Sequence, residues 1–189
     1  MKTTPLVIVA VLIIGLGVGY VSRDLFGGTM PGGIVQNIDQ HFIEEMIPHH
    51  EGAIEMATLA LERPTSDDIL SLSRTIIDAQ TREIVDMKRW YLEWFGTEVS
   101  ESSSMMGMGH GAMGHMQGME GDMEALENAA DFDQEFLSQM IVHHEMAVMM
   151  ARMLSVGTTR TEMQGLADQI ITSQNREIAM MESWLTAQQ

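Results

Sequence analysis

The stretch that decides the fold is Met46-Ile47-Pro48-His49-His50-Glu51, which returns as Met140-Ile141-Val142-His143-His144-Glu145. The offset of 94 residues stays constant around it, with 21 identities in the 52 positions from Asp39 to Trp90 and no gap. A match of this extent indicates an internal duplication. Two copies are too few for a solenoid, but two helical hairpins that pack together form a four-helix bundle.

Each copy carries two stretches whose apolar residues recur at helical spacing. Four N-caps, each with a polar partner three positions later, mark the starts: Asn37 with Gln40, Thr65 with Asp68, Asp131 with Gln134 and Thr159 with Glu162. Pro64 and Gly157 end the first helix of each pair. The sequence therefore predicts an all-α fold, a duplicated helical hairpin forming a four-helix bundle. Its helices are expected near 37–61, 66–95, 131–155 and 160–187, with a kink at Pro48 in the first.

The beginning of the chain predicts a targeting segment. Lys2 precedes an apolar run from Leu6 to Val21, so residues 1–26 are expected to form a signal anchor or a signal peptide. We favour the anchor, because no Ala-x-Ala cleavage site follows the run. We expect residues 27–36 to form a flexible tether and residues 37–189 to form the bundle. In both cases the bundle is expected outside the cytoplasm: membrane-anchored, or secreted or periplasmic if the segment is cleaved.

Composition excludes several classes of protein. The net charge of −17 repels nucleic acid and attracts cations, so no nucleic-acid partner is expected. The chain has no Cys, which excludes disulfides, thiolate zinc sites and iron–sulfur clusters. It has 20 Met, more than a core needs as gap filler. Sulfur is present here only as thioether.

The two copies, repeat 1 (37–95) and repeat 2 (131–189), are joined by a linker over 96–123 that is rich in Gly and Met. Its sequence has neither the periodicity nor the rigidity to pack, so we expect a mobile crossover loop. Because this loop has no core to fill, its soft side chains are candidate metal ligands: Met105, Met106, Met108, His110, Met113, His115, Met116 and Met119.

Polar groups fall on the apolar stripes that should face the core. On a helical wheel both histidines of each motif lie on the stripe, together with Met46 and Met56 in the first copy and Met140 and Met150 in the second. The second helix of each copy adds an amide and a carboxylate to its own stripe: Gln80 and Glu83, then Gln174 and Glu177. Buried polar groups need partners, and the histidines are the polar groups that the facing helices offer.

Two interpretations of this constellation stay open. The histidines can hydrogen-bond to Glu83 and Glu177 as a buried network without a metal. Alternatively they bind metal, with the amides and carboxylates as supporting or alternative ligands. Adjacent helical residues diverge by about 100°, so one histidine of each pair can bind while the other supports it. For metal ligands we favour Met46 with His49 or His50, and Met140 with His143 or His144.

Other candidates have simpler interpretations. His41 points outward and receives no role. Glu51 and Glu145 also point outward, which predicts a solvated face or a contact with Arg82 or Arg176. Some methionines are expected only to fill space in the core: Met87, Met153, Met180 and Met181.

Ligand softness indicates which metal fits. Imidazole suits zinc, copper, iron and nickel, whereas thioether selects Cu(I). Met and His together, without Cys and in an oxidising compartment, favour copper as Cu(I) or Cu(II), with iron as the alternative.

The sequence resembles the domain-of-unknown-function family 305, whose signature is Met-x-x-His-His-x-x-x-x-x-Met-Ala on a helix. The signature stands here twice, from Met46 to Ala57 and from Met140 to Ala151, and the resemblance covers about residues 37–189. Members are similar to ferritin-like four-helix bundles, are commonly exported, and include CopM-type periplasmic copper-binding proteins. The resemblance implies copper binding at the Met and His positions named above. The sequence departs from the ferritin di-iron pattern, because Met rather than Glu stands three residues before His.

Three functions therefore compete. We favour a copper-binding protein without turnover, acting in copper buffering, trafficking or resistance. Its partners would be metal ions, a membrane contacted through the N-terminal segment, and a copper-transfer protein. One alternative is a di-iron or copper oxidoreductase of ferritin-like type, motivated by Glu83 and Glu177 on the core stripe. The other is a structural or adaptor bundle whose histidines are only a polar network.

Overall fold

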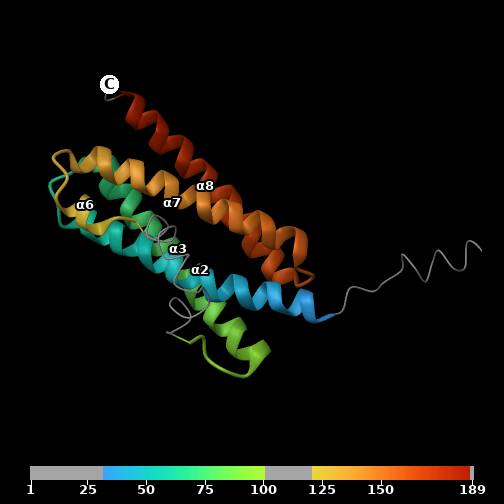
Figure 1. The fold of residues 1–189 in the computed structure, drawn as a ribbon. Coiled ribbons are helices and arrows are strands. Elements are labelled where there is room, and N and C mark those ends of the chain that lie inside the picture. Colours follow the sequence, from blue (N-terminus) through green and yellow to red (C-terminus); the bar gives the residue numbers. More distant parts are fainter. Residues whose placement is uncertain (1–31, 101–120, 188–189) are drawn as a thin grey trace, which may run out of the picture. The chain divides into compact units, whose positions relative to one another are not determined.

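The computed structural model describes residues 32–100 and 121–187 (Figure 1). Its helices are α2 (Gly32–Leu61), α3 (Asp67–Phe95), α6 (Met123–Glu127), α7 (Phe132–Gly157) and α8 (Thr161–Ala187). The all-α prediction is confirmed, because the hairpins α2–α3 and α7–α8 together form the four-helix bundle. No helix among these described ranges combines the length and the apolar character needed to cross a membrane. The predicted signal segment (1–26) and the candidate loop ligands from Met105 to Met119 lie outside the described residues.

The predicted N-caps are confirmed at one helix and wrong at three. Asp131 caps α7 and accepts from the Gln134 backbone N–H at 3.1 Å. At α3 the cap is Ser66, because the Thr65 hydroxyl instead donates to the Asp133 carboxylate. Helix α8 begins at Thr161, two residues after Thr159, since the Thr158 hydroxyl accepts from the Arg160 N–H and closes the turn.

The start of α2 is the third correction. Helix α2 begins at Gly32, so Asn37 lies inside it and residues 32–36 are not a flexible tether. A helix that packing has already nucleated extends into neighbouring residues at little further cost. The helix also continues through Pro48.

The end of the linker forms a short helix that the sequence analysis missed. Asp122 caps α6 by accepting from the Ala125 N–H at 2.9 Å, and Leu126 is fully buried. Gln139 of α7 fixes this turn by accepting from the Asp122 N–H at 2.7 Å and donating to its carbonyl at 3.1 Å. Residues 121–123 are therefore anchored on the bundle rather than part of a free loop.

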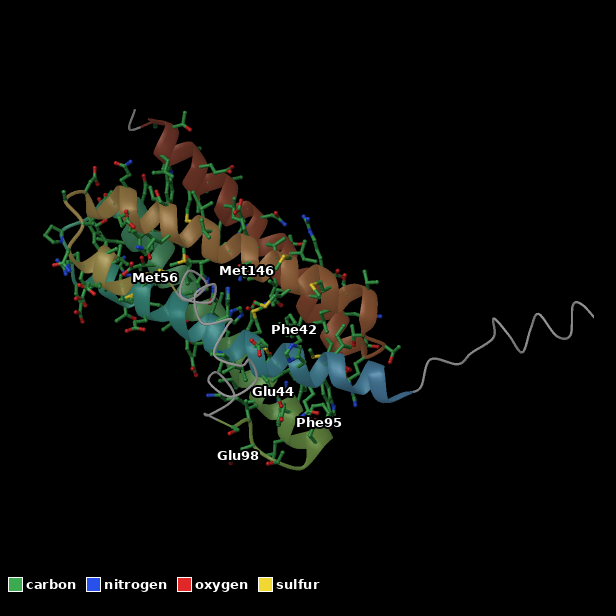
Figure 2. The ribbon with its side chains drawn as sticks, in the orientation of Figure 1. Phe42, Glu44, Met56, Phe95, Glu98 and Met146 are labelled. Atoms are coloured by element: carbon green, nitrogen blue, oxygen red, sulfur yellow. The ribbon has the colours of Figure 1, made fainter. Side chains whose placement is uncertain are left out.

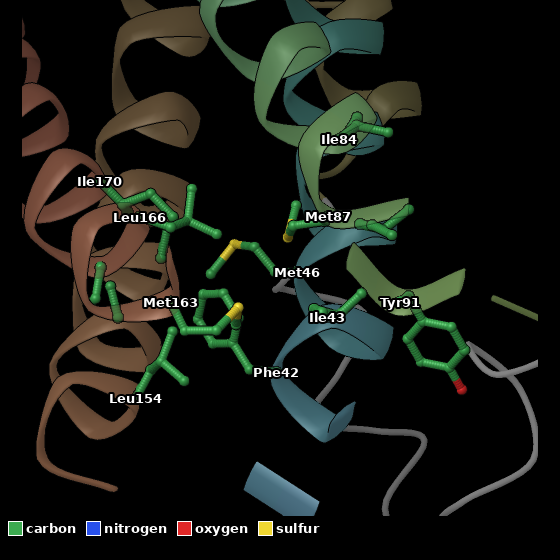
Figure 3. Close-up of a cluster of buried hydrophobic side chains, with 14 residues drawn as sticks. Phe42, Ile43, Met46, Ile84, Met87, Tyr91, Leu154, Met163, Leu166 and Ile170 are labelled. Carbon is green, nitrogen blue, oxygen red and sulfur yellow. The ribbon is translucent and has the colours of Figure 1, made fainter. Parts of the chain in front are cut away.

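The apolar core consists of two clusters. Residues of one cluster correspond to residues of the other at the 94-residue offset of the duplication. Cluster 1 combines the first half of α2 and the second half of α3 with the second half of α7 and the first half of α8. Cluster 2 combines the opposite halves of the same helices. Met46 and Met87 in cluster 1 correspond, at the 94-residue offset, to Met140 and Met181 in cluster 2. The two repeats are therefore related by a pseudo-twofold arrangement, and Figure 3 shows cluster 1 with Met46, Met87 and Met163 inside it.

Each repeat also holds the hairpin turn of the other. Asp133 of repeat 2 accepts from the Thr65 hydroxyl and, at 3.1 Å, from the Ser66 N–H in the turn of repeat 1. The equivalent Asp39 of repeat 1 is buried and pairs with the Arg160 guanidinium in the turn of repeat 2 at 3.2 Å. These reciprocal contacts fix how the two hairpins align, and so which halves of the helices face each other.

Candidate metal site

A layer of buried polar side chains lies between the two apolar clusters. Each of the four long helices contributes two of them, at positions that the duplication repeats. The layer consists of His49 and His50 (α2), Gln80 and Glu83 (α3), His143 and His144 (α7), and Gln174 and Glu177 (α8). The wheel-based prediction that these groups face the core is therefore confirmed.

One histidine of each pair is bonded to a carboxylate. His50 Nε2 lies 2.7 Å from Glu83 Oε2, and His144 Nε2 lies 2.8 Å from Glu177 Oε2. Glu83 Oε1 also accepts from the Gln169 amide at 2.9 Å. The predicted polar network between histidines and carboxylates thus exists, and it accounts for one histidine of each repeat.

The other two histidines contact each other. The rings of His49 and His143 have centroids 3.7 Å apart and planes inclined by 40°, and they are equivalent residues of the two repeats. Neither ring has a hydrogen-bond partner within the protein at either nitrogen. The polar network therefore leaves this central pair unexplained.

Burial keeps the central pair uncharged. Removal from water lowers the pKa of His49 from 6.5 to about 2, and repulsion from His143, His50 and His144 acts in the same direction. The pKa of His143 falls to about 3, again mainly through burial and then through His144 and His50. Neutral imidazole, with a nitrogen lone pair available, is the form that binds metals.

The donor set of the layer fits a soft or borderline metal. Atoms without a partner in the protein also include the Nδ1 atoms of His50 and His144 and the Oε1 atoms of Gln80 and Gln174. Each such buried atom costs about 1–3 kcal/mol, so their concentration in one layer indicates a ligand-binding site. In the described part of the chain, no three His, Asp or Glu side chains stand ready to hold one ion. Within these residues, imidazole pairs and neighbouring thioethers are therefore the candidate donors.

The candidate thioethers flank the histidine layer on both sides. Met46 lies in cluster 1, whereas Met56 and Met140 lie in cluster 2, and all three are fully buried. Met150 is half-buried against cluster 1. Met46 and Met140 are therefore on opposite sides of the layer, so the structure does not bring them together.

Three further methionines place their thioethers in the two apolar clusters beside the histidine layer. Met87 and Met163 are fully buried in cluster 1, and Met181 is fully buried in cluster 2. The prediction of Met87 and Met181 as core filler agrees with this burial. Met163 was missed, because its counterpart is Ile69 and the duplication gave no signal.

Three side chains outside the layer, Met153, Glu51 and His41, are exposed. Met153 was expected to fill the core, but it is 64% exposed, so this prediction is wrong. Glu51 is exposed as predicted, and its ion-pair partner at 3.5 Å is Lys88 rather than Arg82. His41 is exposed as predicted.

The model of the family described as domain of unknown function (DUF305) matches residues 39–185. The chain belongs to the DUF305 family. This confirms the resemblance found in the sequence. Among curated protein sequences, none matches the chain.

Solved structures of related proteins share this bundle. CopM in its Cu(II)-bound form is 47% identical, with a TM-score of 0.71, over 80% of this chain and 97% of CopM. CopM in its Cu(I)-bound form is 43% identical, with a TM-score of 0.67, over 79% and 96%. A DUF305 fragment from Deinococcus radiodurans is 28% identical, with a TM-score of 0.66, over 79% and 96%. The family fold thus spans nearly the whole length of these relatives.

Proposed function

We propose that this protein binds copper outside the cytoplasm and serves in copper buffering, trafficking or resistance. The observation that carries the proposal is the contact of His49 with His143, two buried neutral imidazoles whose four ring nitrogens have no partner in the protein. The similarity to CopM, which has been solved with Cu(I), Cu(II) and silver, supports copper as the metal. Copper is the cargo of the protein rather than a cofactor for turnover.

The two kinds of histidine contribute differently. His49 and His143 would supply imidazole nitrogens from the pseudo-twofold axis. His50 and His144 can each donate from Nε2–H to a carboxylate, which leaves Nδ1 as the nitrogen with a free lone pair. A carboxylate in this position orients the ring and raises the basicity of the ligating nitrogen. Glu83 and Glu177 are therefore positioning residues for His50 and His144.

The neighbouring thioethers favour copper over zinc or iron. Met46 and Met140 stand one helical turn from the histidines, inside the two apolar clusters. Thioether prefers Cu(I), and imidazole accepts both copper oxidation states. A site with both donors can retain copper in either state. The two carboxylates are already bonded to histidines, which does not favour the di-iron alternative.

The extracytoplasmic location rests on the sequence. The apolar run from Leu6 to Val21 lies outside the described residues, and its role as anchor or cleaved signal remains our proposal. The absence of Cys is compatible with an oxidising compartment. A fusion of residues 1–30 to a reporter that is active only outside the cytoplasm would test it, and an inactive but stable fusion would contradict it.

Copper retention by the full chain tests the central site. The double variant His49→Gln and His143→Gln should lose tight copper when it competes with a chelator, since Gln lacks an imidazole nitrogen. His41→Gln is the matched control, because His41 is exposed and assigned no role. Unchanged retention by the double variant, with its helical signal intact, would favour the structural or adaptor interpretation. An optical change dependent on dioxygen in the copper-loaded protein would instead favour an oxidoreductase.

A further inference from the structure

Helix α7 carries exposed methionines on the face opposite the histidine layer. Met149 is 49% exposed and Met153 is 64% exposed, although both are large apolar side chains. They stand four residues apart, and Met146, labelled on α7 in Figure 2, precedes Met149 by three. Residues at these spacings are neighbours on one helix face, with Cβ atoms about 5–6 Å apart. Met149 and Met153 thus form an exposed pair on the outside of the bundle, and the half-buried Met146 stands next to them on the same helix face.

The duplication shows that these methionines are an addition to the fold. The residues of repeat 1 that correspond to Met146, Met149 and Met153 are Gly52, Glu55 and Leu59. By contrast, the buried methionines Met46 and Met87 recur as Met140 and Met181. Repeat 1 builds the same fold without a thioether at these positions, with an exposed Glu55 and a Leu59 that packs against cluster 2, so the fold does not require sulfur there.

The exposed pair borders a groove between α7 and α8. This groove has a volume of about 850 Å³, and Met149 and Met153 line it together with Glu145, Arg152 and Asn175. Glu51, the counterpart of Glu145 in repeat 1, pairs with Lys88, but the residue that corresponds to Lys88 in repeat 2 is Glu182. Among the described residues, Glu145 therefore has no ion pair in the groove.

The donor chemistry identifies the ligand. Thioether sulfur is a soft, uncharged ligand that selects Cu(I) over the harder divalent cations. Glu145 and Arg152 in the groove offset each other in charge, so the preference for one metal over another depends on the softness of the sulfur donors. Met has three rotatable side-chain torsions, which allow neighbouring sulfurs to turn toward one ion.

We propose that Met149 and Met153, assisted by Met146, form a surface site for Cu(I) that is separate from the histidine layer. This site goes beyond the central site, because it shares none of its residues. Met149 and Met153 are exposed, so the ion exchanges directly with solution or with the donors of another protein. The buried imidazoles cannot exchange in this way without an opening of the bundle.

Silver(I), which is soft and not redox-cycled here, serves as the probe in a methionine-oxidation experiment on the full chain. Peroxide should convert Met149 and Met153 to sulfoxides early, because both are exposed, and mass spectrometry locates the products. One equivalent of silver(I) beyond that held by the central site should slow oxidation at both positions at least several-fold. Zinc(II) should not, because thioether is a poor ligand for it. Equal protection by zinc(II), or none by silver(I), would overturn the surface site.

Two matched variants complete the test. Met149→Leu with Met153→Leu keeps the apolar volume but removes both sulfurs, so it should bind one silver ion fewer, whereas Val156→Leu on the same face should bind the same number. Glu55→Met with Leu59→Met places the pair on repeat 1 and should add one ion. Unchanged stoichiometry in both double variants would refute the proposal. All these effects should persist when His49 and His143 are replaced, so failure of the surface site and failure of the central site are distinguishable.

Discussion

The two histidines of each motif are adjacent in sequence but lie in different surroundings. His50 and His144 each bond a buried carboxylate, whereas His49 and His143 contact each other across the pseudo-twofold axis. The turn of about 100° between neighbouring helical residues separates their roles. The motif occurs twice, and each copy supplies one imidazole that is hydrogen-bonded to a carboxylate and one that has no hydrogen-bond partner in the protein. Substitutions at the two kinds of histidine should therefore have opposite consequences.

The largest effect is expected at a carboxylate-bonded histidine. His50→Leu leaves the buried Glu83 carboxylate without the partner that lies 2.7 Å away. A hydrogen bond to a buried charged group typically contributes about 1.5–3 kcal/mol, so the metal-free variant should lose that much unfolding free energy in urea. His41→Leu, at an exposed position, should change it by less than about 0.5 kcal/mol. A similarly small loss for His50→Leu would mean that the pair contributes little.

The sequence predicted which residues face the core but not how they pair. Helical periodicity is local, so it placed all four histidines and Glu83 and Glu177 on buried stripes. Both members of His49–His50 fall within one stripe, and the choice between them depends on how helices far apart in sequence cross. One missed cap has the same origin: Thr65 bonds Asp133, which lies 68 residues away, instead of capping its own helix. The burial of Met163 likewise depends on tertiary packing that no repeat signal revealed.

The central pair should make the metal-free protein sensitive to acid. The folded-state pKa values of His49 and His143, about 2 and about 3, lie below the unfolded value of 6.5. Below pH 6.5 the unfolded chain binds protons at these rings while the folded chain does not, so stability falls as pH decreases toward the folded values. Each ring can contribute up to about 1.4 kcal/mol per pH unit.

Urea unfolding of chelator-treated protein between pH 7.5 and 4.5 measures this sensitivity. The double variant His49→Leu and His143→Leu removes both titrating rings and should give a flatter profile than the wild type. Profiles that run parallel would show that other groups cause the acid sensitivity.

A smaller loss of stability is expected from removing the second hydrogen bond of Glu83, which Glu177 does not share. Glu83 accepts a second hydrogen bond, from Gln169 at 2.9 Å, and Thr75 stands at the equivalent position in repeat 1. Gln169→Leu should therefore cost about 0.5–1.5 kcal/mol in the metal-free protein, since it leaves Glu83 Oε1 without this donor. Thr75→Val is the control, because the Thr75 hydroxyl bonds within its own helix. Equal losses in both variants would remove the distinction between Glu83 and Glu177.

Replacing His49 and His143 should have the smallest effect on stability and the largest effect on copper binding. His49→Leu with His143→Leu replaces two rings that lack hydrogen-bond partners in the protein by apolar groups, so the metal-free variant should unfold within about 1 kcal/mol of the wild type or later. Copper should raise the melting temperature of the wild type, because a ligand at 100 times its Kd stabilises the fold by about 2.7 kcal/mol. The variant should lose most of that rise. If copper stabilised both proteins equally, the metal would bind elsewhere and the central pair would be a packing contact.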